Sequence, residues 1–276
     1  MRRIQIQTKQ IDPEDYLGKY ANVDDVSTIV DEDCVVEVDG KVVLAYIQNM
    51  GGPLEHLRAA LDSHKFGGGA RATNRNAMIT TASVFGYQPR MEFRTATRFC
   101  RVAATARQNK PFHDLLMAWT ASITRVYLEL APDAAKSHKA ETDKRISKEY
   151  QIPQSMFTSG IVNKSNQLPY HYDSGNFIGA WSGMLGLSKN INGGVLSIPE
   201  YDLGIPITDG SLSFFDGQAR IHGVTPFKRT SVDAERYTIV WYSLRKLWEC
   251  LPFKEEIKLA NERVTKGNRK KKVKKT

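Results

Sequence analysis

The first residues that could do chemistry are a histidine and an aspartate two positions apart, His171 and Asp173. They lie in the apolar and aromatic stretch 168–177, which is typical of the end of a strand. In an extended backbone, residues i and i+2 point to the same face, so this imidazole and this carboxylate can bind one cation together. Two histidines and one carboxylate on one side of a transition metal leave its other positions open for chemistry. The pattern therefore predicts that a second histidine elsewhere in the chain completes the metal site.

His222 is the candidate for this third ligand. It follows Asp173 by 49 residues and lies between Ile221 and Gly223 in the second-to-last predicted strand. A glycine at the neighbouring position lets other groups approach the backbone closely. The alternative is a histidine that only packs in the core. Because an H-x-D pair precedes it in the same β-rich region, we interpret His222 as a metal ligand.

Arg236 begins a strongly apolar strand, where an unpaired charge is costly. A planar guanidinium in an apolar cavity is suited to bind a carboxylate through two parallel hydrogen bonds. Thr238 lies two residues further on the same face and adds a hydroxyl donor. The alternative is an ion pair within the chain, with Asp233 or Glu235 as the partner. We predict that Arg236 and Thr238 bind an anionic ligand.

Elements that position these residues follow from periodicity. Residues 111–130 repeat apolar side chains at the helical spacing, residues 54–61 do so more briefly, and residues 35–47 read as a hairpin around Asp39-Gly40. Phe66-Gly-Gly-Gly69 is expected to interrupt regular structure. From residue 156 onward short apolar runs alternate with turn signals, which favours a jelly roll. These runs are 156–162, 177–187, 194–198, 211–215, 220–224 and 237–244. We predict an α+β fold: a double-stranded β-helix (jelly-roll) core with N-terminal helices packed on one sheet.

The net charge of +9 is unevenly distributed along the 276 residues. Residues 263–276 carry eight Lys or Arg and no acid, and residues 66–110 have a net charge of +7. The rest of the chain is acidic. Segregation of this kind is typical of a surface that binds a polyanion. We expect a β-rich extension over 1–52, a main domain over 53–262 with its core at about 156–245, and a disordered basic tail over 263–276.

Cysteine usage and hydropathy bear on the compartment. Cys34, Cys100 and Cys250 are far apart and odd in number, so we expect reduced thiols and neither a disulfide framework nor a zinc site. No apolar run reaches membrane-spanning length, and no apolar stretch follows the basic N-terminus as in a secretory signal. We expect a cytoplasmic monomer, in a bacterium or in a phage-infected host cell.

The order His-x-Asp, then a histidine about 50 residues later, then an arginine in the next strand resembles the Fe(II)/2-oxoglutarate dioxygenases. The resemblance covers about 75 residues and implies that His171, Asp173 and His222 hold Fe(II). It also implies that Arg236, with Thr238, binds the distal carboxylate of 2-oxoglutarate, and that O2 and the keto acid occupy the open metal positions. Decarboxylation of the keto acid to succinate then accompanies hydroxylation of an aliphatic C–H bond.

A looser resemblance concerns the substrate. Asn176 completes H-x-D-x-x-N, which is similar to the TET and J-binding-protein branch that oxidises the 5-methyl group of 5-methylcytosine or thymine in DNA. This implies that Asn176 contacts the target base, although asparagine is also a common turn residue. A base inside a duplex must be flipped out to reach a buried metal. We predict that Tyr87 and Arg90, in the basic segment 66–110, contact the DNA together with the tail 263–276.

Several alternatives stay open. The chain lacks the cysteine-rich region of animal TET enzymes and a recognisable J-base-binding insert, so the resemblance is to a compact phage or bacterial version. The same iron chemistry on a protein, an RNA or a small molecule is one alternative. A DNA-binding module without catalysis is another, although the retention of all three metal ligands and Arg236 argues against it. The sequence does not distinguish 5-methylcytosine from thymine, since an asparagine side chain both donates and accepts.

Overall fold

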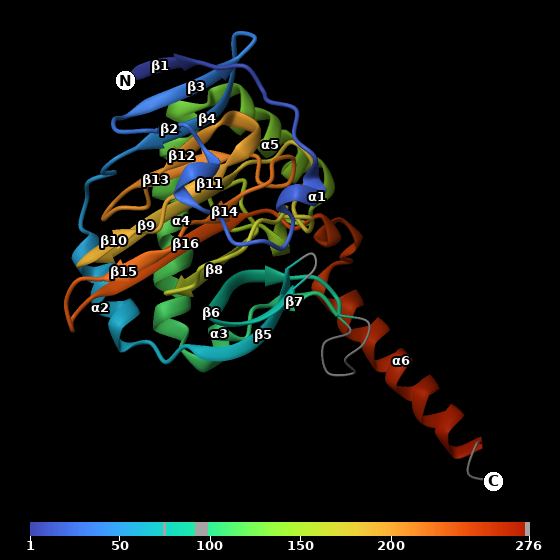
Figure 1. The fold of residues 1–276 in the computed structure, drawn as a ribbon. Helices are drawn as coiled ribbons and strands as arrows, with labels where there is room; N and C mark the ends of the chain where they lie inside the picture. The colour runs from blue at the N-terminus through green and yellow to red at the C-terminus, as the bar shows by residue number, and fades with distance from the viewer. Residues whose placement is uncertain (74–75, 92–98, 274–276) are drawn as a thin grey trace.

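The computed structural model describes residues 1–73, 76–91 and 99–273, and describes no side chains for 68–79 and 264–273. Two β-sheets face each other and helices cover the outer face of the larger sheet (Figure 1). This is the predicted α+β fold with a jelly-roll core. Helix α6 projects away from this body toward the C-terminus.

The larger sheet has ten strands in the order β1-β3-β4-β13-β9-β16-β8-β6-β5, with β7 paired to β6. Strand β16 lies between β9 and β8 and pairs antiparallel with both. The strand bounds are Arg2–Gln5 (β1), Cys34–Val38 (β3), Lys41–Ile47 (β4), Gly67–Thr73 (β5), Asn76–Gln88 (β6), Arg101–Val102 (β7), Ser159–Lys164 (β8), Ser182–Lys189 (β9), Leu212–Phe215 (β13) and Glu235–Tyr242 (β16).

The smaller sheet has four strands in the order β14-β11-β12-β2, and β10 pairs with β15 beside it. The bounds are Thr28–Ile29 (β2), Ile191–Gly193 (β10), Leu196–Ile198 (β11), Leu203–Ile205 (β12), Gly223–Val224 (β14) and Phe227–Arg229 (β15). A buried apolar cluster joins the facing sides of the two sheets and includes Leu44, Ile198 and Phe215. The residues of interest line the space between these sheets.

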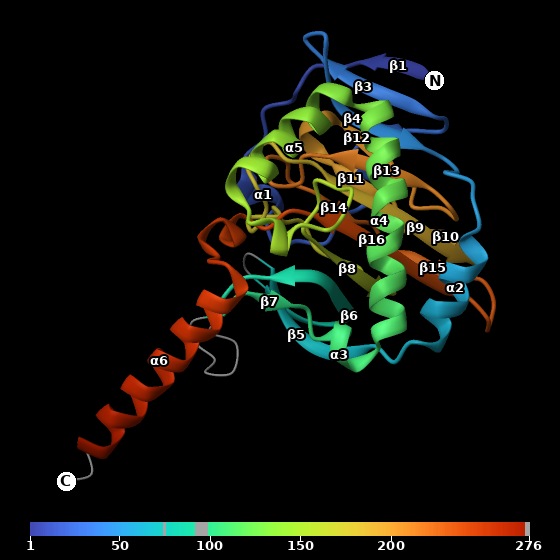
Figure 2. The same cartoon turned by 180° about the vertical axis from the view of Figure 1, so that it is seen from behind.

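Helices α2, α4 and α5 lie on the outer face of the larger sheet (Figure 2). Helix α4 begins where the side chain of Asn109 accepts a hydrogen bond from the backbone N–H of Phe112, and it ends before Pro132. Trp241 of β16 donates its indole N–H to Thr120 of α4 (3.0 Å), which fixes the helix against the central strand. The helix bounds are Pro13–Tyr16 (α1), Leu54–Ser63 (α2), Thr105–Gln108 (α3), Lys110–Leu130 (α4), Pro132–Arg145 (α5) and Phe253–Val273 (α6), with short 3-10 turns at Val23–Asp25, Lys148–Tyr150, Pro199–Tyr201 and Arg245–Glu249. None of the helices in the described ranges is both long and apolar enough to cross a bilayer.

Several expectations about individual elements are confirmed, including the hairpin β3–β4, helices α2 and α4 and the run of strands after residue 156. One is wrong: the glycines at 67–69, expected to interrupt regular structure, belong to strand β5, because β6 supplies a complete antiparallel partner for them. Helix α6 runs from Phe253 to Val273, where a disordered tail was expected from residue 263. Within the expected extension 1–52, β4 pairs with β13 inside the larger sheet.

The cysteine prediction is wrong for two of the three thiols. Cys100 and Cys250, which are 150 residues apart in sequence, form a disulfide with their Cα atoms 5.9 Å apart. Cys34 is a buried free thiol, and burial raises its pKa to about 11. The pairing escaped sequence reasoning because wide spacing says nothing about which segments meet in the fold.

Candidate active site

The three predicted metal ligands come together between the two sheets. His171 and His222 form an isolated antiparallel bridge, in which each backbone N–H donates to the carbonyl of the other residue at 2.9 and 3.1 Å. The backbone N–H of Asp173 donates to the carbonyl of Gly217 at 2.8 Å, which fixes the aspartate on the same side. The H-x-D segment is thus tied twice to the segment that carries the second histidine.

The side chains of this triad converge on one point. Nε2 of His171 lies 3.7 Å from Oδ1 of Asp173, and Nε2 of His222 lies 4.0 Å from Oδ2 of the same carboxylate. One ligand atom from each residue lies within 4.8 Å of the others. Ligands that each sit about 2.1 Å from a metal are roughly 3–4 Å apart, so these separations fit a first-row divalent ion.

A backbone carbonyl group orients each of the two imidazole rings through its Nδ1 atom. Nδ1 of His171 lies 2.8 Å from the carbonyl oxygen of Pro169, and Nδ1 of His222 lies 2.9 Å from that of Arg220. Because a carbonyl oxygen only accepts, each Nδ1 carries the proton and each Nε2 presents its lone pair to the cluster. This is the tautomer that metal-binding histidines use, and it is held by the backbone.

Arg236 lies buried at the polar end of the same pocket, with 1% of its surface exposed. Its Nη1 donates to the carbonyl of Asn166 at 3.3 Å and its Nη2 donates to that of Gly194 at 3.4 Å, while Nε is buried without a partner. Burial lowers the pKa of this guanidinium to about 10. Among the described residues, no carboxylate forms an ion pair with Arg236; the predicted alternative partner Asp233 instead pairs with Lys189.

A cavity of about 250 Å³ joins this arginine to the triad. Thr238 lies on its wall and is 6% exposed, two residues from Arg236 on the same strand. The lining of the cavity is largely apolar, with Met184, Leu196 and Val240 among its side chains. The His-Asp-His cluster and a buried guanidinium that has no carboxylate partner among the described residues therefore line one cavity. That combination suits a small ligand whose one end binds the metal and whose other end is a carboxylate.

Asn176 also lines the cavity, but its amide nitrogen is directed at protein groups. Nδ2 donates to Ser182 Oγ at 3.0 Å and to Asp173 Oδ2 at 3.4 Å. Asn176 is 5% exposed and forms an isolated bridge with Leu244. In this structure its amide N–H groups thus support the Asp173 carboxylate, which leaves the carbonyl oxygen as the group able to meet a ligand.

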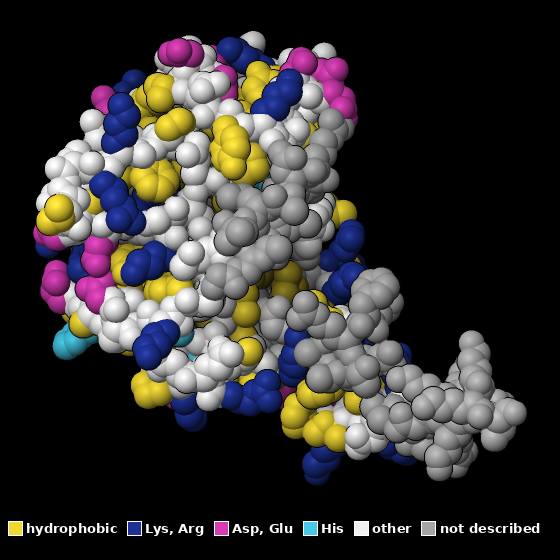
Figure 3. All heavy atoms as spheres, turned by 60° about the horizontal axis from the view of Figure 1, so that its bottom comes forward, with side chains coloured by type: hydrophobic (Ala, Val, Ile, Leu, Met, Phe, Trp, Pro, Cys, Tyr) yellow, Lys and Arg dark blue, Asp and Glu magenta, His cyan; other side chains and the backbone are white. Residues whose placement is uncertain are grey.

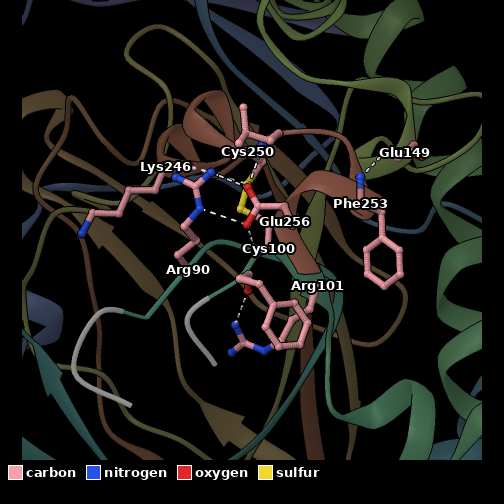
Figure 4. Close-up of polar contacts among 10 residues, drawn as sticks. Arg90, Cys100, Arg101, Glu149, Lys246, Cys250, Phe253 and Glu256 are labelled. Atoms are coloured by element: carbon pink, nitrogen blue, oxygen red, sulfur yellow. Dashed lines mark hydrogen bonds and ion pairs between the residues drawn. A yellow bond between two sulfur atoms is a disulfide. The ribbon is translucent and has the colours of Figure 1, made fainter. Parts of the chain in front are cut away.

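The structure does not bring Tyr87 and Arg90 into the pocket. The ring of Tyr87 packs edge-on against Tyr150, with centroids 5.8 Å apart. Arg90 forms a bidentate ion pair with Glu256 at the start of α6, with Nε donating at 2.9 Å (Figure 4). The predicted contact of both residues with DNA has no support from these interactions.

Glu256 is the centre of this second cluster. Its side chain is fully buried and also accepts hydrogen bonds from the backbone N–H groups of Cys100 (2.9 Å) and Leu251 (2.8 Å). Burial alone raises the pKa of this carboxyl, but the hydrogen bonds from Arg90 and the two N–H groups outweigh it and the pKa is lowered. The Cys100–Cys250 disulfide lies beside the pair (Figure 4). Together these contacts fasten the base of α6 to the loop that precedes β7.

Sequence reasoning missed three residues of the site. Asn163 and Asn166 lie beside Thr238 and Arg236, and Gly217 packs against the triad. A Cβ atom on Gly217 would lie 2.8 Å from Asp173 Oδ2 and 3.1 Å from His222 Cε1. The polar pair N-x-x-N at the end of a strand was the available signal for the first two. Nothing in the sequence distinguishes Gly217 from an ordinary turn glycine.

Surface charge follows the pattern expected from the sequence only in part. On the face in Figure 3, Lys and Arg side chains are spread over the described surface, while Asp and Glu gather mainly at the edges remote from α6. Within the basic segment, Arg107 and Lys110 are exposed, but Lys110 pairs with Asp114. The side chains of Arg71, Arg75, Arg94 and Arg98 and those of the tail beyond Arg263 lie outside the described set.

No protein-family model matches the chain. Among curated proteins it is similar to the bifunctional helicase and thymine dioxygenase JBP2 of Trypanosoma brucei brucei, with 26% identity over 240 residues. The match includes 83% of this chain and 21% of the relative, so the chain spans about a fifth of that protein's length.

Among solved structures, the chain is similar to NgTET1 in complex with 5mC DNA, with a TM-score of 0.60 and 17% identity over 85% of this chain and 86% of that one. A 2OG-Fe(II) oxygenase family protein from Burkholderia pseudomallei is more distant, with a TM-score of 0.46 and 10% identity over 72% of this chain and 84% of that one. The chain is TET/JBP-like: it resembles JBP2 in sequence and NgTET1 in fold.

Proposed function

We propose that this protein is an Fe(II)- and 2-oxoglutarate-dependent dioxygenase that hydroxylates the 5-methyl group of a pyrimidine in DNA. The observation that carries the proposal is the pairing, in one cavity, of a His-Asp-His cluster with a buried arginine that has no carboxylate partner among the described residues. A buried charge of this kind is costly unless a ligand compensates it.

The residues fit the implied metal. His171 and His222 present Nε2, because backbone carbonyls hold their Nδ1–H groups, and Asp173 supplies the carboxylate. Two imidazoles and one carboxylate are the ligand set of non-heme Fe(II) oxygenases. Bound there, the metal supplies oxygen activation coupled to decarboxylation of the keto acid. Two imidazoles and one carboxylate would leave further positions of the metal for the co-substrate and oxygen.

Arg236 and Thr238 fit the distal carboxylate of 2-oxoglutarate. The unpartnered Nε and the weakly engaged Nη atoms of Arg236 offer charge-assisted donors, and the Thr238 hydroxyl lies on the same wall. The largely apolar lining of the cavity, with Met184, Leu196 and Val240 among its side chains, suits the carbon chain of the co-substrate. The co-substrate is then held at both ends, which fixes it relative to the metal.

Two observations support DNA as the substrate. The relative JBP2 is described as a thymine dioxygenase, and NgTET1 was solved in complex with 5mC DNA. The chain itself has a basic segment at 66–110 and a basic tail at 263–276, suited to a phosphate backbone. A methyl group in the duplex reaches a metal site inside a cavity only after the base is flipped out. Asn176, at the wall of the cavity, is the residue we propose to contact that base.

The test is a direct product analysis. Purified protein is loaded anaerobically with Fe(II) and 2-oxoglutarate, mixed with methylated or unmethylated DNA, and exposed to air. Mass spectrometry of the nucleosides is expected to show 5-hydroxymethylcytosine or 5-hydroxymethyluridine. His171→Ala is the inactive comparison, and His56→Ala is the matched control because His56 is exposed on α2.

Each other outcome favours a named alternative. Succinate without modified nucleosides supports the iron-dependent oxygenase activity but excludes DNA as the substrate, and it favours a protein, an RNA or a small molecule instead. Neither succinate nor modified nucleosides, from protein that retains bound iron, favours a DNA-binding module without catalysis. The identity of the modified nucleoside decides between 5-methylcytosine and thymine.

A further inference from the structure

Two asparagines stand behind the proposed carboxylate site. Asn163 lies on β8 directly opposite Thr238 of β16, and Asn166 follows just after the end of β8. Their side chains are 5% and 8% exposed, and both line the cavity. Buried carboxamides are costly unless their hydrogen bonds are made, so the partners of these two groups identify their role.

Asn166 is fixed by the neighbouring strand β6. Its Nδ2 donates to the carbonyl of Thr81 and its Oδ1 accepts from the N–H of Thr81, both at 3.0 Å. The pairing of β6 with β8 ends at Ala82 and Asn163. At the adjacent residue of β6, Thr81, the carboxamide of Asn166 makes the hydrogen bonds that a partner on β8 would make. This two-point contact determines which atom of the amide is nitrogen and which is oxygen.

The orientation of the Asn166 carboxamide determines that of the Asn163 carboxamide. Asn163 in turn determines the direction in which the Thr238 hydroxyl donates. Asn166 Nδ2 donates to Asn163 Oδ1 at 3.1 Å, so the nitrogen of Asn163 points the other way. That nitrogen donates to Thr238 Oγ1 at 3.4 Å. Because Oγ1 accepts this hydrogen bond, the proton of the Thr238 hydroxyl is available for another acceptor.

The same asparagine also holds the arginine. The backbone carbonyl of Asn166 accepts from Arg236 Nη1 at 3.3 Å, and the neighbouring N–H of Ser165 donates to the carbonyl of Arg236 at 2.9 Å. The polar end of the cavity is therefore one connected unit. It runs from Thr81 through Asn166 to Asn163 and Thr238 on one side and to Arg236 on the other.

We propose that Asn163 and Asn166 are positioning residues for the distal carboxylate of 2-oxoglutarate, with Asn163 acting through Thr238 and Asn166 through both Asn163 and Arg236. This inference rests on the proposed function, since it concerns the same co-substrate. In the bound state the Thr238 hydroxyl donates to one carboxylate oxygen and the guanidinium donates to the carboxylate from Nε and Nη. Asn163 makes the hydroxyl a donor toward the ligand.

The sharpest variant is Asn163→Asp, which has almost the same shape. An aspartate has no N–H to offer, so it accepts the Thr238 proton, turns the hydroxyl away from the ligand and adds a negative charge beside the carboxylate. We expect binding of 2-oxoglutarate to weaken at least a hundredfold, and about tenfold for Asn163→Ala. The readout is anaerobic titration calorimetry of the Fe(II)-loaded protein. Asn192→Asp, at an exposed position on β10, is the matched control.

A second measurement separates positioning from folding. If Asn163 acts through Thr238, Asn163→Ala has no further effect on 2-oxoglutarate affinity in a Thr238→Val background, because the hydroxyl that it orients is gone. Affinity losses that add in the double variant overturn the inference, as does a wild-type affinity in Asn163→Asp. Melting temperatures measured without ligand identify any variant that loses 2-oxoglutarate affinity because it is partly unfolded. For such a variant, the affinities of Thr238→Val and of the double variant are compared at a temperature where both are folded.

The inference and the proposed function fail in different ways. Wild-type protein that binds Fe(II) but not 2-oxoglutarate overturns both. Wild-type protein that binds 2-oxoglutarate, with variants that bind it equally well, overturns the positioning role alone. Binding that is lost in Asn163→Asp and retained in Asn192→Asp supports it, whatever the substrate of the oxygenase proves to be.

Discussion

His171 and His222 meet as a bridge of two residues that exchange both backbone hydrogen bonds, at 2.9 and 3.1 Å. Their ring centroids are 4.4 Å apart, although 50 other residues separate them in sequence. The two histidines proposed as metal ligands are therefore placed by main-chain pairing, and their side chains add the donor atoms. Loss of either imidazole leaves this backbone pairing in place.

The first prediction concerns metal binding. His222→Ala is expected to lower the affinity for Fe(II), or for Co(II) as a spectroscopic probe, by at least a hundredfold, because one of three ligands is removed. The far-ultraviolet circular dichroism and the urea midpoint should change little, since the bridge hydrogen bonds are main-chain bonds. His56→Ala serves as the control. Unchanged Co(II) affinity in His222→Ala excludes this residue as a ligand.

Arg236→Met separates stability from binding. The guanidinium is buried and its charge has no carboxylate partner among the described side chains, so an apolar replacement is expected to raise the free energy of unfolding of the ligand-free protein by about 1–3 kcal/mol. The same change should abolish the increase in melting temperature that 2-oxoglutarate produces in the wild type. Urea denaturation and thermal denaturation measure the two effects. A variant that unfolds more easily than the wild type contradicts this account.

Gly217→Ala tests the packing behind the triad. The added methyl group would approach Asp173 Oδ2 to 2.8 Å, so the carboxylate or the loop must shift. We expect Co(II) affinity to fall roughly tenfold or more while the urea midpoint changes little, because the clash concerns one carboxylate. Gly67→Ala is the matched control, since a Cβ there meets nothing within 4 Å. Equal Co(II) affinity in both variants would rule out a tight fit at Gly217.

His138 predicts a pH dependence of stability. This residue on α5 is buried, its Nε2 lies 2.8 Å from Ser243 Oγ, and burial lowers its pKa to about 3. In the unfolded chain the imidazole of His138 takes up a proton below about pH 6.5, whereas in the folded protein it stays neutral until about pH 3. The free energy of unfolding therefore falls as the pH drops from 6.5 toward 3. At pH 5 the free energy of unfolding is lower by about 2 kcal/mol from this group alone than it is near neutral pH.

Urea titrations of wild type and His138→Gln at pH 7 and pH 5 measure this contribution. Glutamine keeps a polar group near Ser243 but does not titrate, so the variant should lose less stability between the two pH values. His56→Gln, at the exposed position on α2, should lose as much as the wild type. A His138→Gln variant with the full acid sensitivity would falsify the assignment.

Glu256→Gln is expected to be strongly destabilising. It leaves Arg90 charged and 17% exposed with no carboxylate, which typically costs about 3–5 kcal/mol. Glu255→Gln, one residue earlier and exposed, should change stability by less than about 0.5 kcal/mol. Hydrogen exchange at the start of α6 should report the local loosening of the helix. A double variant Arg90→Met with Glu256→Leu should recover much of the loss, because neither charge then remains buried.

The sequence by itself identified the local features of this protein. Helix α4 follows from apolar side chains at the helical period, and the hairpin β3–β4 follows from alternation around Asp39-Gly40. The H-x-D spacing fixes two candidate ligands on one face, because alternate residues of an extended chain point the same way. Arg236 stood out because a charge at the start of an apolar strand requires a reason.

Tertiary structure alone decided the pairings between distant residues. Arg90 was expected to contact DNA, yet it meets Glu256, which is 166 residues away in sequence. Cys100 and Cys250 were expected to be separate thiols, yet the fold brings them together across 150 residues. The proposed role of Asn163 depends on β8 lying between β16 and β6. The physical reason is that periodicity reports which face of an element is buried, whereas the partner on that face depends on which elements pack together.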